Sequence, residues 1–216
     1  TSLITPYHAN WHEEVEVPSY DPEEAKSILD AAGYEDVDGD GMREDTEGEP
    51  LSINFASMSG GDIAEPLANY YIQAWRDVGL NVELTNGRLI EFNSFYDMVE
   101  NDDPEIDIYQ GAWGVGSDVD PSGLYGPDAP FNYTRYETEE STDLLAKGNS
   151  QEALDIDYRK DIYNQWSELM VEDIPVIPTL YRAFVTPVNE RVINYSEDYE
   201  WNEDLLWYRV GVEDAE

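Results

Sequence analysis

The sequence predicts an α/β fold, and the order of its apolar patterns is the main reason. Between residues 51 and 113, strand-like and helical patterns take turns, at 51–56, 62–79, 80–85, 92–99 and 106–113. Such alternation indicates a sheet with right-handed helical crossovers. The chain has 216 residues, of which 41% are hydrophobic, so it can bury a sizeable core. We therefore expect a mixed α/β sheet.

The first helix is expected to begin at Asp21 and end at Gly33. Asp21 is a good N-cap, Pro22 suits the first helical position and two glutamates follow in the first turn. Glycine commonly ends a helix. The apolar residues at helical spacing predict a buried stripe of Ala25, Ile28, Leu29 and Ala32.

Four further segments are expected outside this alternating region. Residues 1–20 read as irregular, and the prolines there favour an extended segment over a helix that could bring His8 and His12 to one metal. Two helices are expected at 139–147 and 152–172. The second has an inner face of Leu154, Tyr158, Ile162, Trp166 and Leu169. Residues 174–188 are extended, as an edge strand or a crossing between sheets, because prolines interrupt them.

Charge excludes several classes of function. The chain carries 49 Asp and Glu against 11 Lys and Arg, a formal net charge of -38. Such a surface repels nucleic acid and anionic lipid. There is no cysteine, which removes disulfides and thiol catalysis, and no apolar run approaches the length of a membrane span. The chain opens without methionine or a signal peptide, so we expect a mature or excised piece.

The same charge predicts a response to salt. Self-repulsion at -38 weakens as the Debye length falls from about 10 Å at 0.1 M salt to about 3 Å at 1 M. We therefore expect a halophilic source and a thermal stability that rises between low and molar KCl. A flat or falling melting temperature over that range would leave the other interpretation, an ordinary acidic protein at an anionic cell wall.

The loop from Asp36 to Glu47 has the spacing of a calcium-binding loop. Carboxylates occupy positions 1, 3, 5, 9 and 12, Gly41 is at the turn position 6, and a backbone carbonyl is expected from position 7. The candidate ligands are Asp36, Asp38, Asp40, Met42, Glu44 and Glu47. Arg43 at position 8 and the lack of a following helix depart from an EF-hand. The alternatives are a structural Ca²⁺ site, with no other cofactor required, and an acidic turn.

A glycine-rich stretch follows the third strand, from Gly111 to Tyr125. Four glycines and Pro121 break regular structure and allow close approach of another backbone. Trp113 stands at the strand end, and Asp118 and Asp120 lie just beyond it. These features suit an extended ligand with a positive end, because strand edges bind peptides through backbone hydrogen bonds. A loop that merely closes a strand is the alternative.

Four stretches, in order, resemble the extracellular solute-binding proteins of ABC importers, family 5, the oligopeptide, dipeptide and nickel class. They are 20–34, 36–44, 111–136 and 172–182. The resemblance implies the carboxyl-terminal part of a type II, cluster C, periplasmic-binding-protein-like fold with two lobes. Residues 1–20 would lead in from the missing lobe, 21–173 would form the ligand-binding lobe, and 174–216 would return to the missing lobe.

The resemblance also implies site residues and a role. The backbone of Ala112, Trp113 and Gly114 would pair with a peptide, and Asp118, or Asp120 in its place, would bind the α-ammonium. The protein would capture peptides outside the cell, as a monomer anchored like a lipoprotein or in the periplasm, and deliver them to the permease subunits. It would not be an enzyme.

Two other functions remain open from the residues alone. One is a calcium-stabilised cell-surface binding module. The other is a glycoside hydrolase using Asp118 and Asp120, which requires one acid with a raised pKa and a fixed separation of the two carboxylates.

Overall fold

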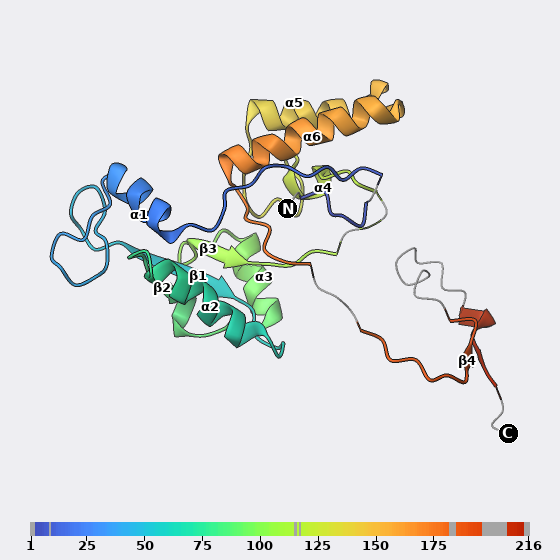
Figure 1. Ribbon diagram of the computed structural model, residues 1–216, viewed down its shortest axis with the longest axis horizontal. Helices are drawn as coiled ribbons and strands as arrows, with labels where there is room; N and C mark the ends of the chain where they lie inside the picture. The colour runs from blue at the N-terminus through green and yellow to red at the C-terminus, as the bar shows by residue number, and fades with distance from the viewer. Residues whose placement is uncertain are drawn as a thin grey trace.

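The computed structural model describes residues 3–8, 10–114, 116, 118–181, 185–195 and 207–213 (Figure 1). Its helices are α1 (Pro22–Ala31), α2 (Ala64–Arg76), α3 (Phe92–Glu100), α4 (Ser122–Tyr125), α5 (Glu139–Gly148) and α6 (Ile156–Asp173). Its strands are β1 (Ser52–Ser57), β2 (Asn81–Leu84), β3 (Ile108–Gln110), β4 (Val192–Ile193) and β5 (Gly211–Val212).

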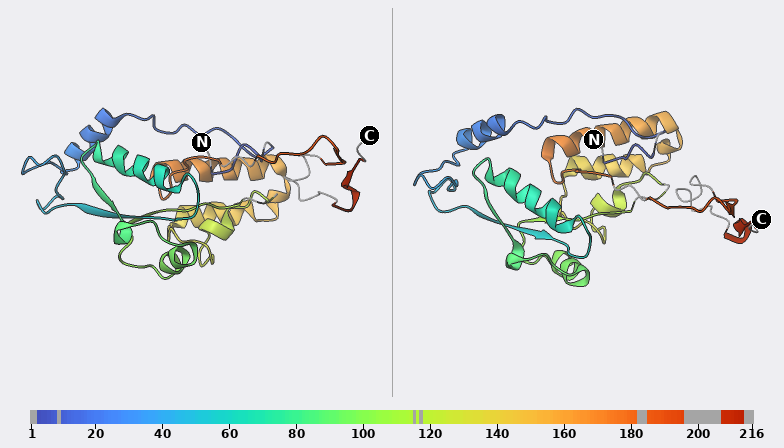
Figure 2. Two further views of the ribbon diagram at one scale, coloured as in Figure 1. Left: turned by 90° about the horizontal axis from the view of Figure 1, so that it is seen from below. Right: turned by 60° about the horizontal axis from the view of Figure 1, so that its bottom comes forward.

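A three-stranded sheet forms the first half of the molecule. The strand order is β2-β1-β3, and both pairings are parallel. Successive side chains of a strand point to opposite faces. Phe55 of β1 accordingly packs with Ala68 of α2, whereas Ala56 packs with Phe95 and Val99 of α3. The two helices therefore cover opposite faces of the sheet, as Figure 2 shows, and the predicted α/β class is confirmed.

A second core lies between α5, α6 and the N-terminal segment. Trp166 and Tyr163 of α6 are fully buried there with Leu144 and Leu145 of α5. Ile4 and Val119 join this core from segments far apart in the sequence. The glycine-rich stretch thus runs from the sheet at one end to the helical core at the other (Figure 1).

The predicted buried face of α1 is wrong, and so is the place of Leu154 on the inner face of α6, whose other four residues do pack in the core. The apolar stripe of α1 is not buried in the described part of the molecule: α1 has no buried residue, and Ile28 is 62% exposed. Polar contacts of Arg43 hold α1 instead. Leu154 is 83% exposed because it belongs to a separate 3-10 turn, η2 (Glu152–Leu154), and α6 starts only after its N-cap, Asp155.

The third strand is shorter than predicted. It pairs with β1 only from Ile108 to Gln110, opposite Phe55 to Ser57. Beyond Ser57, the residues after β1 bond to Ile90 and no longer to the chain after β3. The Ile90 carbonyl accepts a hydrogen bond from Ser59 N at 2.8 Å. Residues 111–114 therefore continue past the end of the strand that would have paired with them.

In the described C-terminal residues, β4 pairs antiparallel with β5. Residues 174–181 and 185–188 are not assigned to a strand, Ile174 has a left-handed backbone, and Ile177 and Val185 are 67% and 89% exposed. Residues 182–184, 196–206 and 214–216, which belong to the predicted return segment, lie outside the described residues.

Candidate functional site

The first part of the candidate site is a free stretch of backbone after β3. Residues 111–114 are exposed, and among the described residues no backbone hydrogen bond joins Ala112, Trp113 or Gly114 to a partner. In open α/β sheets, ligands bind beyond the carboxyl ends of the parallel strands, and this stretch lies at the carboxyl end of β3. Its N–H and C=O groups are available to an added peptide strand. We call residues 111–114 the shelf.

A cluster of aromatic rings borders the shelf. The Trp113 ring centroid lies 5.2 Å from that of Phe131, 5.8 Å from that of Tyr133 and 6.3 Å from that of Tyr96. Phe92 of α3 contacts Tyr96 at 4.9 Å between centroids. Together these five rings line a hollow of about 550 Å³ that we call the aromatic groove. Trp113 remains 41% exposed, so the predicted tip of the strand faces solvent.

Asp118 presents a carboxylate near the other end of the loop. Its side chain is 73% exposed, and Arg159 Nη2 of α6 donates to its Oδ1 at 3.4 Å. Arg159 itself is held by its Nε bond to the Gly148 carbonyl, 2.9 Å, and its guanidinium lies 5.3 Å from the Trp11 ring centroid. Asp118 is therefore a charged, accessible acceptor that already faces one cation.

Asp120 has a different environment. Its Oδ1 accepts from Ser122 N (3.0 Å), Ser122 Oγ (2.6 Å), Asn149 Nδ2 (2.9 Å) and Tyr163 OH (3.3 Å). Burial by itself would raise the pKa of Asp120, but these hydrogen bonds to the charged form outweigh it and lower the pKa. The carboxylate thus joins α4 to the end of α5 and to α6. It supports the loop and is poorly placed to replace Asp118.

The two aspartates do not resemble an acid–base pair of a hydrolase. A general acid needs a raised pKa, and the pKa of Asp120 is lowered. Asp118 Oδ1 instead accepts from the Asp120 backbone N–H at 3.1 Å, which is a local turn contact.

Sequence reasoning missed three residues that hold the loop. Arg159 and Tyr163 are one helical turn apart on α6 and reach Asp118 and Asp120 across more than 40 positions of sequence. His8 Nε2 contacts the Gly116 carbonyl at 2.7 Å from the N-terminal segment. Nothing local in the sequence pairs these residues. His12 Nδ1 contacts the Ile4 carbonyl at 2.6 Å, so both imidazoles have backbone partners.

The acidic loop brings together three of its six candidate metal ligands. Carboxylate oxygens of Asp36, Asp38 and Asp40 lie within 4.8 Å of one another. Glu44 is buried and accepts from Val37 N at 2.6 Å, and neither it nor Glu47 belongs to the group. Asp40 Oδ1 accepts from Met42 N at 2.8 Å. Hard oxygens at this spacing fit Ca²⁺, with water completing the shell.

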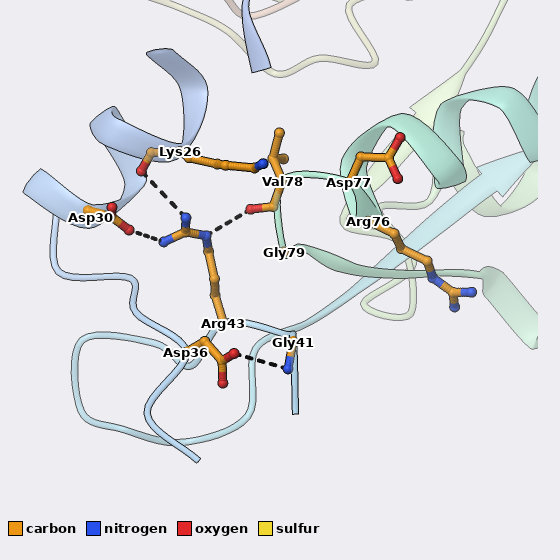
Figure 3. Close-up of a pocket in the computed structure, with 9 residues that line it drawn as sticks. All are labelled: Lys26, Asp30, Asp36, Gly41, Arg43, Arg76, Asp77, Val78 and Gly79. Carbon is orange, nitrogen blue, oxygen red and sulfur yellow. Dashed lines mark hydrogen bonds and ion pairs between the residues drawn. The ribbon is translucent and has the colours of Figure 1, made fainter. Parts of the chain in front are cut away.

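Arg43 occupies the position at which the loop departs from the calcium-loop pattern. Its contacts hold the loop against α1 and the turn after α2. It is 8% exposed, and its Nε donates to the Val78 carbonyl at 2.8 Å. Its Nη1 donates to Asp30 Oδ1 at 2.5 Å and to the Tyr34 carbonyl. Figure 3 shows the guanidinium between α1 and the turn after α2. Gly79, with φ +89°, permits this approach, because a Cβ there would lie 3.0 Å from Arg43 Cγ.

Fold and site together present an unpaired backbone stretch after β3, an aromatic wall and an exposed acid on an α/β sheet. The chain belongs to the bacterial extracellular solute-binding proteins of family 5, whose middle-region family model matches residues 1–135. The predicted family is therefore confirmed. Within the part of the chain that the structure describes, none of the helices has the length and apolar character that crossing a bilayer requires.

Individual relatives agree with this assignment. The chain is 33% identical over 194 residues to the oligopeptide-binding protein OppA of Lactococcus lactis subsp. lactis (strain IL1403), which is 89% of this chain and 32% of OppA. It superposes with a TM-score of 0.86 on lactococcal OppA complexed with an endogenous peptide in the closed conformation. That match has 32% identity and covers 98% of this chain and 39% of that one.

A second solved structure shows a different ligand on a similar fold. The mannohexaose-bound periplasmic oligopeptide-binding protein from Thermotoga maritima matches with a TM-score of 0.63 and 27% identity, over 74% of this chain and 30% of that one. The present chain spans about a third of the length of the curated relatives it matches, 32% in the case of OppA.

Proposed function

We propose that this chain is part of the substrate-binding component of an ABC importer that captures oligopeptides or dipeptides outside the cell. The observation that carries the proposal is the shelf: Ala112 to Gly114 lack backbone partners in the described structure and lie beside exposed rings. A peptide main chain is the ligand that satisfies such an edge. Similarity to the peptide-complexed lactococcal OppA supports this choice. We further propose that the protein acts as a monomer, without catalysis, and hands its ligand to permease subunits.

In this proposal Asp118 binds the α-ammonium of the peptide. Its carboxylate is 73% exposed and can reach an incoming ammonium, and the Arg159 guanidinium 3.4 Å away offsets part of its charge. Asp120 accepts several hydrogen bonds from within the protein, which lower its pKa. We therefore assign it to holding the loop in place. Anchoring of the protein to the cell surface, in the manner of a lipoprotein, belongs to the same proposal.

Changing Asp118 to asparagine in the full-length protein is expected to weaken binding of peptides with free amino termini by about 10- to 100-fold, because a charge-assisted hydrogen bond contributes about 1.5–3 kcal/mol. Amino-acetylated versions of the same peptides should lose less than about twofold, since their ammonium is already absent. Calorimetric titration of both peptide sets measures the effect. Asp157→Asn, at an exposed acid of α6, is the matched control.

An equal loss for free and acetylated peptides would refute the role of Asp118. Binding of mannohexaose without any binding of peptides, by wild-type protein, would refute the peptide proposal itself. That outcome is informative because rings beside a shelf also suit the faces of sugars, and a related protein has been solved with mannohexaose.

We also propose that Asp36, Asp38 and Asp40 hold a structural Ca²⁺. Adding Ca²⁺ to metal-stripped protein is expected to stabilise it by about 2.7 kcal/mol at a concentration 100 times the Kd. A calorimetric titration and a thermal melt measure the binding and the stabilisation. Asp38→Asn should abolish both, whereas Glu47→Gln should retain them, because Glu47 lies outside the group of three. Absence of binding heat would leave an acidic turn with no metal.

A further inference from the structure

Two acidic residues line the aromatic groove beside its rings. Besides its five rings, the groove is lined by Asp97 and Glu100 of α3, and by Asn93 one turn before Asp97. Residues 92, 96 and 100 are four apart, as are 93 and 97, so one face of the helix presents both rings and carboxylates to the groove. The opposite face of the helix, with Phe95 and Val99, is buried against the sheet.

Both acidic side chains keep their charge available. Asp97 and Glu100 are exposed, and the side-chain contact described for the Asp97 carboxylate is a long one, 3.3 Å, from Asn101 Nδ2. One cation, Arg135, contacts the end of α3, and its Nε pairs with the Asp102 carboxylate at 3.2 Å. Its other nitrogens donate to the carbonyls of Tyr133 and Val99, at 2.7 and 2.9 Å. Its Nη2 also donates to the backbone carbonyl of Glu100 at 3.2 Å, so the guanidinium lies beside the groove with its N–H groups bound to Asp102 and to backbone carbonyls.

The groove opens directly onto the shelf. Ala112 and Trp113 belong to both, because they lie in the free backbone stretch and also line the hollow. In an added strand, alternate side chains point to the same side. A peptide lying along the shelf would direct one side chain toward these rings.

We propose that the aromatic groove receives a lysine or arginine side chain of the bound peptide, so that the protein selects peptides with a basic residue at one fixed position. This inference rests on the proposed peptide-binding function and names a substrate class within it. Charge complementarity carries it: aromatic faces attract cations, and two carboxylates at the rim add to that attraction. A volume of about 550 Å³ leaves space for a long side chain. In this proposal the carboxylates and the flat aromatic faces of the groove both attract the positive charge of the basic side chain.

The test compares arginine with citrulline, which has the same shape and no charge. Full-length protein is titrated with alanine pentapeptides that carry arginine or citrulline at each position in turn. At one position, arginine should bind about tenfold more tightly than citrulline. In the Asp97→Asn/Glu100→Gln variant that ratio should fall to about 3, because the rings still attract the guanidinium, while the affinity for the citrulline peptide stays unchanged.

A general attraction of cations to a chain of net charge -38 needs its own control. Glu65→Gln/Glu172→Gln removes two exposed charges from α2 and α6 and should leave the ratio at its wild-type value. If wild-type protein binds the peptides but shows no arginine preference at any position, or if both double variants change the ratio equally, the inference is overturned and the peptide-binding proposal stands. If no peptide binds at all, the proposed function fails instead.

Discussion

Replacing Trp166 with alanine is expected to lower the free energy of unfolding by about 3–5 kcal/mol, the usual cost of truncating a fully buried aromatic residue. The Trp166 side chain is 0% exposed at the centre of the core between α5 and α6. Its Nε1 donates to Ser141 Oγ at 3.1 Å, and its ring lies 5.3 Å from that of Tyr125 between centroids. The variant loses this packing and leaves the buried Ser141 hydroxyl without its donor.

The site should weaken together with this core. Tyr125 is the last residue of α4, and Asp120 accepts a hydrogen bond from Ser122 N at the start of that helix. Val119 of the loop packs in the same core as Trp166. Urea unfolding measures the loss of stability, and peptide titration measures the loss of affinity. Tyr70→Ala, at a tyrosine that is 63% exposed on α2, should cost less than about 1 kcal/mol. An unchanged peptide affinity in Trp166→Ala would mean that the helical core does not stabilise the loop.

Local signals in the sequence predicted most of the secondary structure. The N-cap at Asp21 is real, since its carboxylate accepts from the backbone N–H groups of Glu23 and Glu24. The alternation of strand and helix patterns gave the correct class because each pattern reports a buried face. The predicted burial of the α1 stripe was wrong because an apolar pattern predicts a buried face but does not identify the element that covers it. In the described structure no residue of α1 is buried.

The candidate site was only partly predictable. Glycines, Trp113 and two aspartates within a short stretch identify the loop, because their chemistry is local. Which aspartate faces solvent depends on Asn149 and Tyr163, which are distant in sequence. The role of Arg43 was also hidden, since its partners Asp30 and Val78 come from other elements. Contacts of this kind arise from the tertiary fold and leave no local pattern.

Replacing Gly148 with alanine is expected to destabilise the protein by about 1–3 kcal/mol through overpacking. An added Cβ would lie 2.3 Å from Tyr163 Cε1 and 2.9 Å from its Cζ, and the ring is fully buried. Alanine is intrinsically better than glycine in a helix by about 0.8–1.0 kcal/mol. This gain is smaller at the end of α5, where Gly148 is the last residue. The clash therefore decides the sign.

The displaced ring also links this change to ligand binding. Tyr163 OH donates toward Asp120 Oδ1, 3.3 Å, and accepts from Arg159 Nη2, 3.1 Å, so moving the ring disturbs the supports of both loop aspartates. Gly123→Ala in α4 is the matched control, because a Cβ there meets nothing within 4 Å. Urea unfolding should separate the two variants, and peptide affinity should fall only in Gly148→Ala.

Adding Tyr163→Leu tests whether the ring is the cause. A smaller side chain relieves the clash, so the double variant should lose less stability than the sum of its two single changes. Additive losses would show that Gly148→Ala acts through the backbone of α5 and not through Tyr163. In that case Gly148 would be needed for the helix end itself, and peptide affinity in Gly148→Ala should then remain at its wild-type value.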